Sequence, residues 1–167
     1  MIAKTRDDVT RTPGADETAA LADELNCLAH GEPWHGPSLD ALLSGVSVAT
    51  AAARPIAGAH TIWELVLHLT GWTDVVQRRL DGEALEEPVA GDFPLPSEAA
   101  ERPWAAAMEG LRQANGRLVE RVAALSDADL DSPVNGRDYR VRFMLRGAIC
   151  HMAYHSGQIG LLRKLAS

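Results

Sequence analysis

The chain has 167 residues and a formal net charge of −7 at pH 7, with 16 Lys and Arg against 23 Asp and Glu. This acidic balance argues against nucleic acid as a partner, because phosphate binding needs a basic surface. The length favours one domain with a hydrophobic core, and the two cysteines exclude a disulfide framework. No apolar run approaches the ~18 residues of a membrane span, and the first residues lack the long apolar region of a signal peptide. We therefore expect a reduced, cytoplasmic protein that does not enter a membrane.

The first segment, 1–15, is polar and charged and ends near a Pro-Gly pair, so we expect a flexible N-terminal tail. The rest of the chain, 16–167, is expected to form a single domain. Ala and Leu dominate it, which favours helices. A first long helix is predicted from about Asp16 to Gly31, because leucines recur at helical spacing and glycine ends helices.

Two short helices are predicted next, with Ser38 and Ser47 as their N-caps. The clearest helix start in the chain follows, at a Thr-Ile-Trp-Glu sequence over 61–64. A Thr with a Glu three residues later is the pattern of a capping box. We predict that this second long helix runs to about Leu80, and that it carries His68.

A long connection rich in proline is predicted over 83–96, and a third long helix starts between residues 97 and 104. An Asn-Gly pair at 135–136 is a tight-turn signal. Because Tyr139 and Val141 alternate after it, a small β-hairpin is predicted there.

The fourth long helix is predicted from about Arg142 to about Ala166. Four long amphipathic helices in one domain of this size predict an all-α four-helix bundle with short extra helices in its loops. Such bundles build metal sites from side chains on facing helices.

The last helix carries His151 and His155, which lie one turn apart on the same face. Imidazoles at this spacing suit zinc, nickel or iron, and Gln158 falls on the same face. The Glu of a metalloprotease His-Glu-x-x-His motif is absent, because Met152 takes its place. His68 is the natural third ligand. Three protein ligands leave a position for water or substrate, as in catalytic sites.

Each candidate residue also has an interpretation without a metal, and the three histidines could be hydrogen-bonded core residues. Glu64 could orient His68, although its capping role already explains it. His35 could reach the mouth of the site and Tyr154 could line a pocket, but structural roles are favoured for both. Cys150 is interpreted as a core residue. The tryptophans are expected in the core or in pocket walls: Trp34, Trp63, Trp72 and Trp104.

Three segments together resemble the DinB-like superfamily: Trp-His-Gly-Pro-Ser at 34–38, His-Thr-Ile-Trp-Glu-Leu-Val-Leu-His at 60–68, and His-x-x-x-His-x-Gly-Gln-Ile at 151–159. This superfamily includes damage-inducible DinB proteins, YfiT-type metal-dependent hydrolases, and thiol-dependent S-transferases and maleylpyruvate isomerase. The resemblance covers about Glu17 to the C-terminus. It implies an up-down-down-up four-helix bundle, a homodimer, and a divalent metal held by three histidines. Carried over to this chain, those ligands are His68, His151 and His155.

The resemblance implies an enzyme that uses the metal to activate a small thiol, such as bacillithiol, mycothiol or glutathione, against a small electrophilic substrate. A hydrolase that activates water instead is equally compatible with the sequence. Because these thiols are acidic, cations are expected at the pocket mouth, and Arg54, Arg137 and Arg140 are candidates. The alternatives are a non-catalytic metal-binding stress-response protein and a bundle that acts only as an interaction module.

Overall fold

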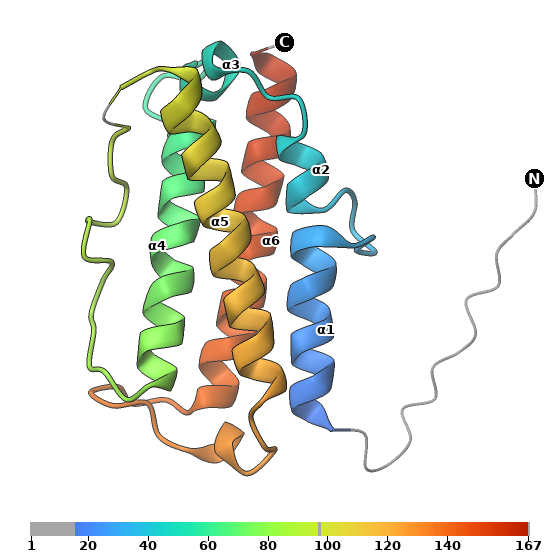
Figure 1. Ribbon diagram of the computed structural model, residues 1–167, viewed down its shortest axis with the longest axis vertical. Coiled ribbons are helices and arrows are strands. Elements are labelled where there is room, and N and C mark those ends of the chain that lie inside the picture. The colour runs from blue at the N-terminus through green and yellow to red at the C-terminus, as the bar shows by residue number, and fades with distance from the viewer. Residues whose placement is uncertain (1–15, 97, 167) are drawn as a thin grey trace, which may run out of the picture.

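The computed structural model describes residues 16–96 and 98–166, and over these residues the chain is helical and contains no β-strand. This confirms the predicted all-α fold. The proposed tail over 1–15 lies outside the described residues. The long helices form a bundle (Figure 1): α1 (Glu17–His30), α4 (Ile62–Leu80), α5 (Glu101–Ala123) and α6 (Val141–Leu165). The short helices lie in the connections: α2 (Leu39–Leu43), α3 (Val48–Ala52) and the 3₁₀ helix η1 (Asp129–Asp131).

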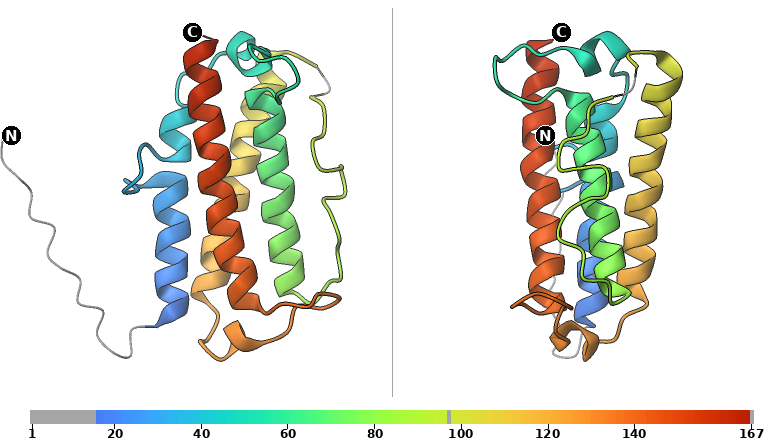
Figure 2. Two further views of the ribbon diagram at one scale, coloured as in Figure 1. Left: turned by 180° about the vertical axis from the view of Figure 1, so that it is seen from behind. Right: turned by 90° about the vertical axis from the view of Figure 1, so that its left-hand side faces the viewer.

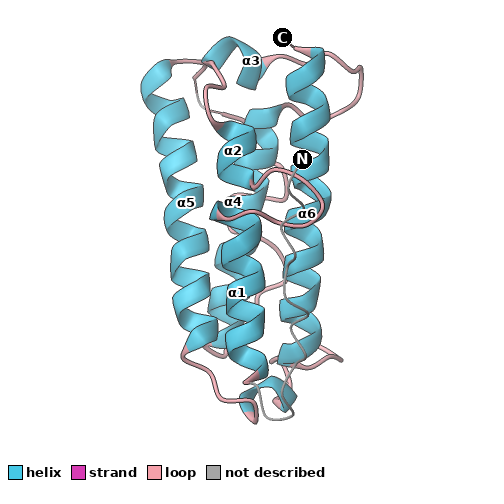
Figure 3. Cartoon of the chain, turned by 90° about the vertical axis from the view of Figure 1, so that its right-hand side faces the viewer, coloured by secondary structure: helices cyan, strands magenta, loops and turns pink. Residues whose placement is uncertain are grey.

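The long helices run up, down, down and up in chain order, as the views in Figures 1 and 2 agree. α4 packs against α5 and α6, and α1 packs against the same two helices, so α1 and α4 lie on a diagonal. α1 is shorter than the others, and α2 continues its corner of the bundle above it (Figure 3). In the described part of the chain, no helix is long and apolar enough to cross a membrane.

The parallel direction of α4 and α5 dictates a long connection between them. The chain must return along the whole bundle before α5 can begin, and it does so on the outside of α4 (Figures 1 and 2). We call this segment, residues 81–96 and 98–100, the crossover. It approaches α4 closely, since a Cβ added at Gly71 would lie 2.9 Å from Cβ of the buried Pro88. The glycine therefore lets the crossover lie against the helix.

The predicted capping box is confirmed at the start of α4. The Thr61 N–H donates to Glu64 Oε2 at 2.7 Å, and the Glu64 N–H donates to Thr61 Oγ1 at 3.1 Å. Ser47 caps α3 in a similar way through the Thr50 N–H, whereas Ser38 precedes α2 without a capping hydrogen bond from its side chain. These local interactions fix the helix starts, and the cap of α4 sets the register that places His68.

The core lies between the long helices and includes two of the predicted tryptophans. The rings of Trp63 and Trp104 are 5.2 Å apart, and Trp104 Nε1 donates to the carbonyl of Val46 at 2.9 Å. Trp72 lines a cavity, as expected. Trp34 is 92% exposed, so its assignment to the core or a pocket wall is wrong. It stands in the loop between α1 and α2, which runs over the surface as loops generally do.

Two further local predictions are wrong. In place of a hairpin, the described residues show one isolated β-bridge between Pro133 and Arg140, and Val141 already belongs to α6. The Asn-Gly pair at 135–136 reverses the chain, but the residues after it begin α6 and so leave no strand to pair. Cys150 is exposed rather than packed in the core, because its position on α6 faces away from the neighbouring helices.

Candidate metal centre

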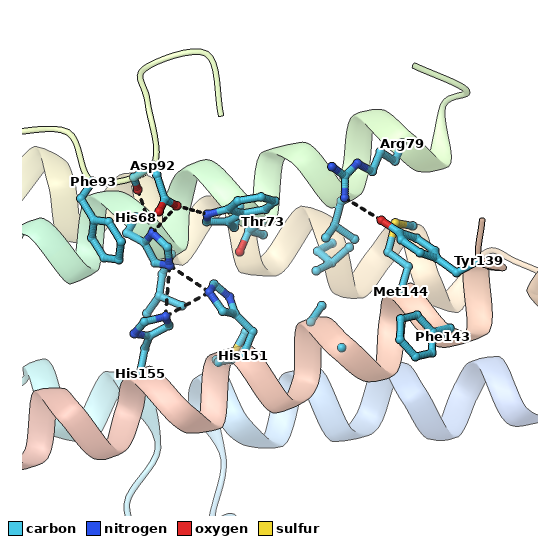
Figure 4. A pocket seen from close by; sticks show the side chains of 17 residues that line it. His68, Thr73, Arg79, Asp92, Phe93, Tyr139, Phe143, Met144, His151 and His155 are labelled. Carbon is cyan, nitrogen blue, oxygen red and sulfur yellow. Dashed lines mark hydrogen bonds and ion pairs between the residues drawn. The ribbon is translucent and has the colours of Figure 1, made fainter. Parts of the chain in front are cut away.

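Three imidazoles converge between α4 and α6 (Figure 4). His68 Nε2 lies 2.9 Å from His151 Nε2 and 3.0 Å from His155 Nε2. The two nitrogens from α6 are 3.0 Å apart. The three ring nitrogens thus form a nearly equilateral triangle.

The helices position these side chains through simple periodicity. His151 and His155 are four residues apart on α6, so both rings point to the same side of that helix. α6 packs against α4, where His68 stands one turn after the Glu64 of the capping box. His68 and His155 are buried and His151 is half-buried, so the triangle lies at the edge of the core.

Hydrogen bonds on the far side of two rings determine which nitrogen carries the hydrogen. His68 Nδ1 donates to the Asp92 carbonyl at 2.7 Å and lies 3.1 Å from Asp92 Oδ1. His155 Nδ1 donates to Gln158 Oε1 at 2.6 Å. Because these partners are oxygen acceptors, the hydrogen of each neutral ring is on Nδ1. The Nε2 atoms of His68 and His155 then carry free lone pairs.

These lone pairs point into a space that a cation fits. Two unprotonated nitrogens 3.0 Å apart, as in His68 and His155, repel each other unless a positive charge lies between them. Imidazole nitrogens ~2.0–2.1 Å from a divalent metal lie about 3.0–3.4 Å apart, depending on the angle between them. The donor set therefore fits a divalent metal, and three imidazoles accept several such metals.

The environment also keeps the imidazoles of His151 and His155 neutral, which metal binding requires. Burial lowers the pKa of His151 to about 4, with further lowering by His155 and His68 and an opposing effect of Asp92. Burial also lowers the pKa of His155, although its hydrogen bond to Gln158 acts in the opposite direction. Both rings are unprotonated at neutral pH and are available as ligands.

The crossover covers the centre with Asp92 and Phe93. The Phe93 ring stacks between His60, at 3.6 Å between centroids, and His68, at 4.0 Å. Asp92 Oδ1 also accepts a hydrogen bond from Trp72 Nε1 at 2.7 Å. His68 is thus held at its edge by Asp92 and on its face by Phe93.

The sequence alone did not single out Asp92 and Phe93. Their segment was predicted only as a connection. The available signal was its length, because long connections in compact domains often carry function.

Of the candidates expected around the metal, Gln158 contacts a proposed ligand and Glu64 does not. Glu64 Oε1 instead accepts from Arg54 Nη2 at 2.6 Å, and its other oxygen belongs to the capping box. Burial acts to raise the pKa of Glu64, but the hydrogen bonds from Thr61 and Arg54 bring it below its usual value. The hydrogen-bond acceptor beside His68 is Asp92, so Glu64 serves the helix start.

His35 and Tyr154 lie outside the centre. His35 is exposed and lines a separate cavity beside Gly160 of α6. The ring of Tyr154 is 5.0 Å from that of His155, but Tyr154 is 65% exposed and faces outward. The cations expected at the pocket mouth do not line the cavity beside the histidines either: Arg54, Arg137 and Arg140.

The triangle of nitrogens opens onto a cavity of about 410 Å³ between α4 and α6 (Figure 4). Pockets of this size bind small organic molecules. Apolar side chains form most of its wall: Leu69, Val76, Leu118, Met144, Ala148 and Met152. Arg79 and Tyr139 line the end away from the histidines. The centre therefore has one side held by protein and one side accessible to a ligand.

Comparison with known proteins places the chain in a family. A family model described as the DinB superfamily matches residues 34–159, which is more than half of the chain. The matched range contains all three histidines and the crossover residues that contact them. No curated protein and no solved structure matches the chain.

Proposed function

The chain belongs to the DinB superfamily, and we propose that it is a divalent-metal-dependent enzyme acting on a small electrophilic substrate. His68, His151 and His155 are the proposed ligands. One observation carries the proposal: their Nε2 atoms lie 2.9–3.0 Å apart on the wall of a cavity of about 410 Å³. A structural site is closed by protein ligands, whereas a catalytic site keeps a position for substrate.

A divalent metal held there would favour the deprotonated form of a thiol or of water at neutral pH. The surrounding residues have separate tasks. Asp92 and Gln158 hold the hydrogens at Nδ1 of His68 and His155, and so orient the two rings. Phe93 shields one face of His68 from water. The apolar cavity wall positions the substrate beside the centre.

We propose thiol-dependent S-transfer as the reaction, with hydrolysis as the second form. Asp92 is the carboxylate that lines the cavity, and its side chain already accepts from Trp72 and lies beside His68 Nδ1. Hydrolysis needs a group that takes a proton from water. Asp92, the candidate for this role, is already engaged in these two contacts. A thiol, with an ordinary pKa of about 8.5, ionises far more readily and does not need that base.

The test uses protein reconstituted with zinc or nickel. Bacillithiol, mycothiol and glutathione are each mixed with monochlorobimane, and conjugation is followed by fluorescence. 4-Nitrophenyl acetate without thiol tests hydrolysis. We expect thiol-dependent conjugation above the uncatalysed rate, reduced about a hundredfold or more in His155→Ala and retained in the exposed control His35→Ala.

Equal rates in the wild type and His155→Ala would contradict the enzymatic proposal. Ester hydrolysis that needs no thiol would replace S-transfer with the hydrolase form. Metal binding without turnover of either kind would favour the non-catalytic metal-binding protein of the same fold.

A further inference from the structure

The cavity has a second polar end, formed by Arg79 of α4 and Tyr139 (Figure 4). Arg79 follows His68 by eleven residues on one helix, which separates their backbones by about 16 Å along the axis. The intervening positions Trp72 and Val76 face the same cavity. A molecule lying along this face would contact the histidines at one end and Arg79 at the other.

Arg79 is a buried cation without a carboxylate partner among the described residues. It is 8% exposed, and its guanidinium donates to the carbonyl of Leu85 at 2.9 and 2.7 Å and to that of Glu86 at 2.9 Å. Its remaining bond is to the Tyr139 hydroxyl at 2.9 Å. All of these acceptors are neutral. A guanidinium stays charged in proteins, and a buried charge is costly unless an opposite charge compensates it.

The electrostatic surroundings of Arg79 agree with this description. Burial lowers the pKa of its guanidinium, and the nearby Arg137 lowers it further, while Tyr139 acts in the opposite direction. This end of the cavity therefore holds the buried positive charge of Arg79, which would attract an anion that entered it.

Two donor hydrogens remain at this end. Nη1 of Arg79 carries two hydrogens, and one of them is used by the Tyr139 oxygen. That oxygen is the acceptor, so the Tyr139 hydroxyl hydrogen is left for another partner. Both groups line the cavity. A cationic N–H and a neutral O–H side by side match the two oxygens of one carboxylate.

We propose that Arg79 and Tyr139 bind a carboxylate group of the substrate, whose reactive carbon lies at the histidine end. The substrate class is then an elongated carboxylate with an apolar middle, because its two ends are separated along α4. The position of the reactive carbon rests on the proposed function. The carboxylate site does not.

Arg79 also anchors the crossover, so the test must separate binding from anchoring. Arg137 provides a matched control, because its Nη2 donates to the same Leu85 carbonyl at 2.6 Å and Arg137 does not line the cavity. Tyr139→Phe removes one hydroxyl and keeps the guanidinium bonds to Leu85 and Glu86. Arg79→Gln removes the charge.

The experiment is calorimetric titration of metal-free protein with octanoate and with octanamide, its neutral counterpart. In the wild type, octanoate is expected to bind at least about tenfold more tightly, as a hydrogen-bonded charge pair predicts. Arg79→Gln and Tyr139→Phe should each reduce that ratio by about threefold or more. Arg137→Gln should keep most of the preference for octanoate over octanamide.

Equal affinities in the wild type, or no binding of octanoate, would overturn the carboxylate site. An equal loss of the ratio in Arg137→Gln would also overturn it, because the effect would then come from the crossover. If Arg79→Gln does not fold, the Tyr139→Phe result decides. Octanohydroxamate with the zinc-loaded protein reports on the metal centre separately. If octanohydroxamate does not bind the zinc-loaded protein while octanoate keeps its selectivity over octanamide, the result would contradict the proposed function and leave the carboxylate site intact.

Discussion

Individual hydrogen bonds decide whether three imidazoles can share one ion. His68 and His155 each place a hydrogen on Nδ1, directed to Asp92 and Gln158, and so direct a lone pair inward. Outer partners of this kind fix the orientation of a ligand and raise its basicity. We therefore attribute the geometry of the centre to these acceptors as much as to the histidines.

Gln158→Leu should weaken metal binding because it removes the acceptor of His155 Nδ1 while keeping the size of the side chain. We expect a loss of about tenfold to a hundredfold in affinity, measured by competition with a chromogenic chelator. Gln113→Leu is the matched control, since Gln113 is exposed on α5 and bonds only to Glu109 among the described residues. Similar affinities in the two variants would show that the acceptor is unimportant.

Acid should destabilise the metal-free protein through the buried histidines. The pKa of His151 falls from 6.5 to about 4 on folding, so between these values the unfolded chain binds the extra proton. Stability then rises with pH in this window and is lost as pH falls from 6.5 toward 4. The pKa of His155 is also lowered in the folded protein, so its titration changes the stability in the same direction.

The measurement for this effect is the urea midpoint of the metal-free protein at several pH values from 7 down to 5. We expect a shallower decline in His151→Gln than in the wild type, because the variant lacks that titrating group. His35→Gln is the control with an exposed histidine. Parallel declines in the wild type and His151→Gln would contradict the assignment.

The sequence was sufficient to predict the three histidines as a set, and the reason is local. His151 and His155 follow from an i, i+4 spacing, and the capping box fixes the helix that carries His68. Asp92 and Arg79 could not be predicted as parts of the site. Their roles depend on where the crossover passes, which no local pattern encodes.

The directions of the helices explain why the crossover covers the metal centre. Since α4 and α5 run in parallel, the crossover must return along the bundle, and it passes over His68 with Asp92 and Phe93. The helix starts were predictable from caps, whereas the exposed side of α6 at Cys150 was not, because helical periodicity does not say which faces meet neighbours.

Gly71→Ala should loosen the crossover. The new Cβ would lie 2.9 Å from Cβ of Pro88, and overpacking of this kind costs about 1–3 kcal/mol. Metal affinity should fall as well, because Asp92 moves with the segment. In Gly116→Ala of α5 the Cβ meets nothing within 4 Å, so helix propensity should raise stability by up to about 1 kcal/mol. Urea unfolding measures both variants, and equal stabilities would contradict the close approach.

The molecule combines the helical fold of the DinB superfamily with a candidate metal centre that opens onto a cavity, in a chain of net charge −7. The homodimer that the resemblance implies stays a prediction. Large apolar side chains recur on one exposed face of α6, where we expect such contacts: Tyr154, Leu161 and Leu165. The metal centre lies about a quarter of a turn round that helix from this face, toward α4.

We expect the three histidines to bind one metal ion, and elemental analysis of purified protein without a metal-binding tag measures this. We predict about one equivalent of zinc, nickel or iron per chain in the wild type and in His35→Ala, and its loss in His155→Ala. Absence of metal from the wild type even after reconstitution, or an unchanged metal content in His155→Ala, would show that these histidines do not hold a metal ion.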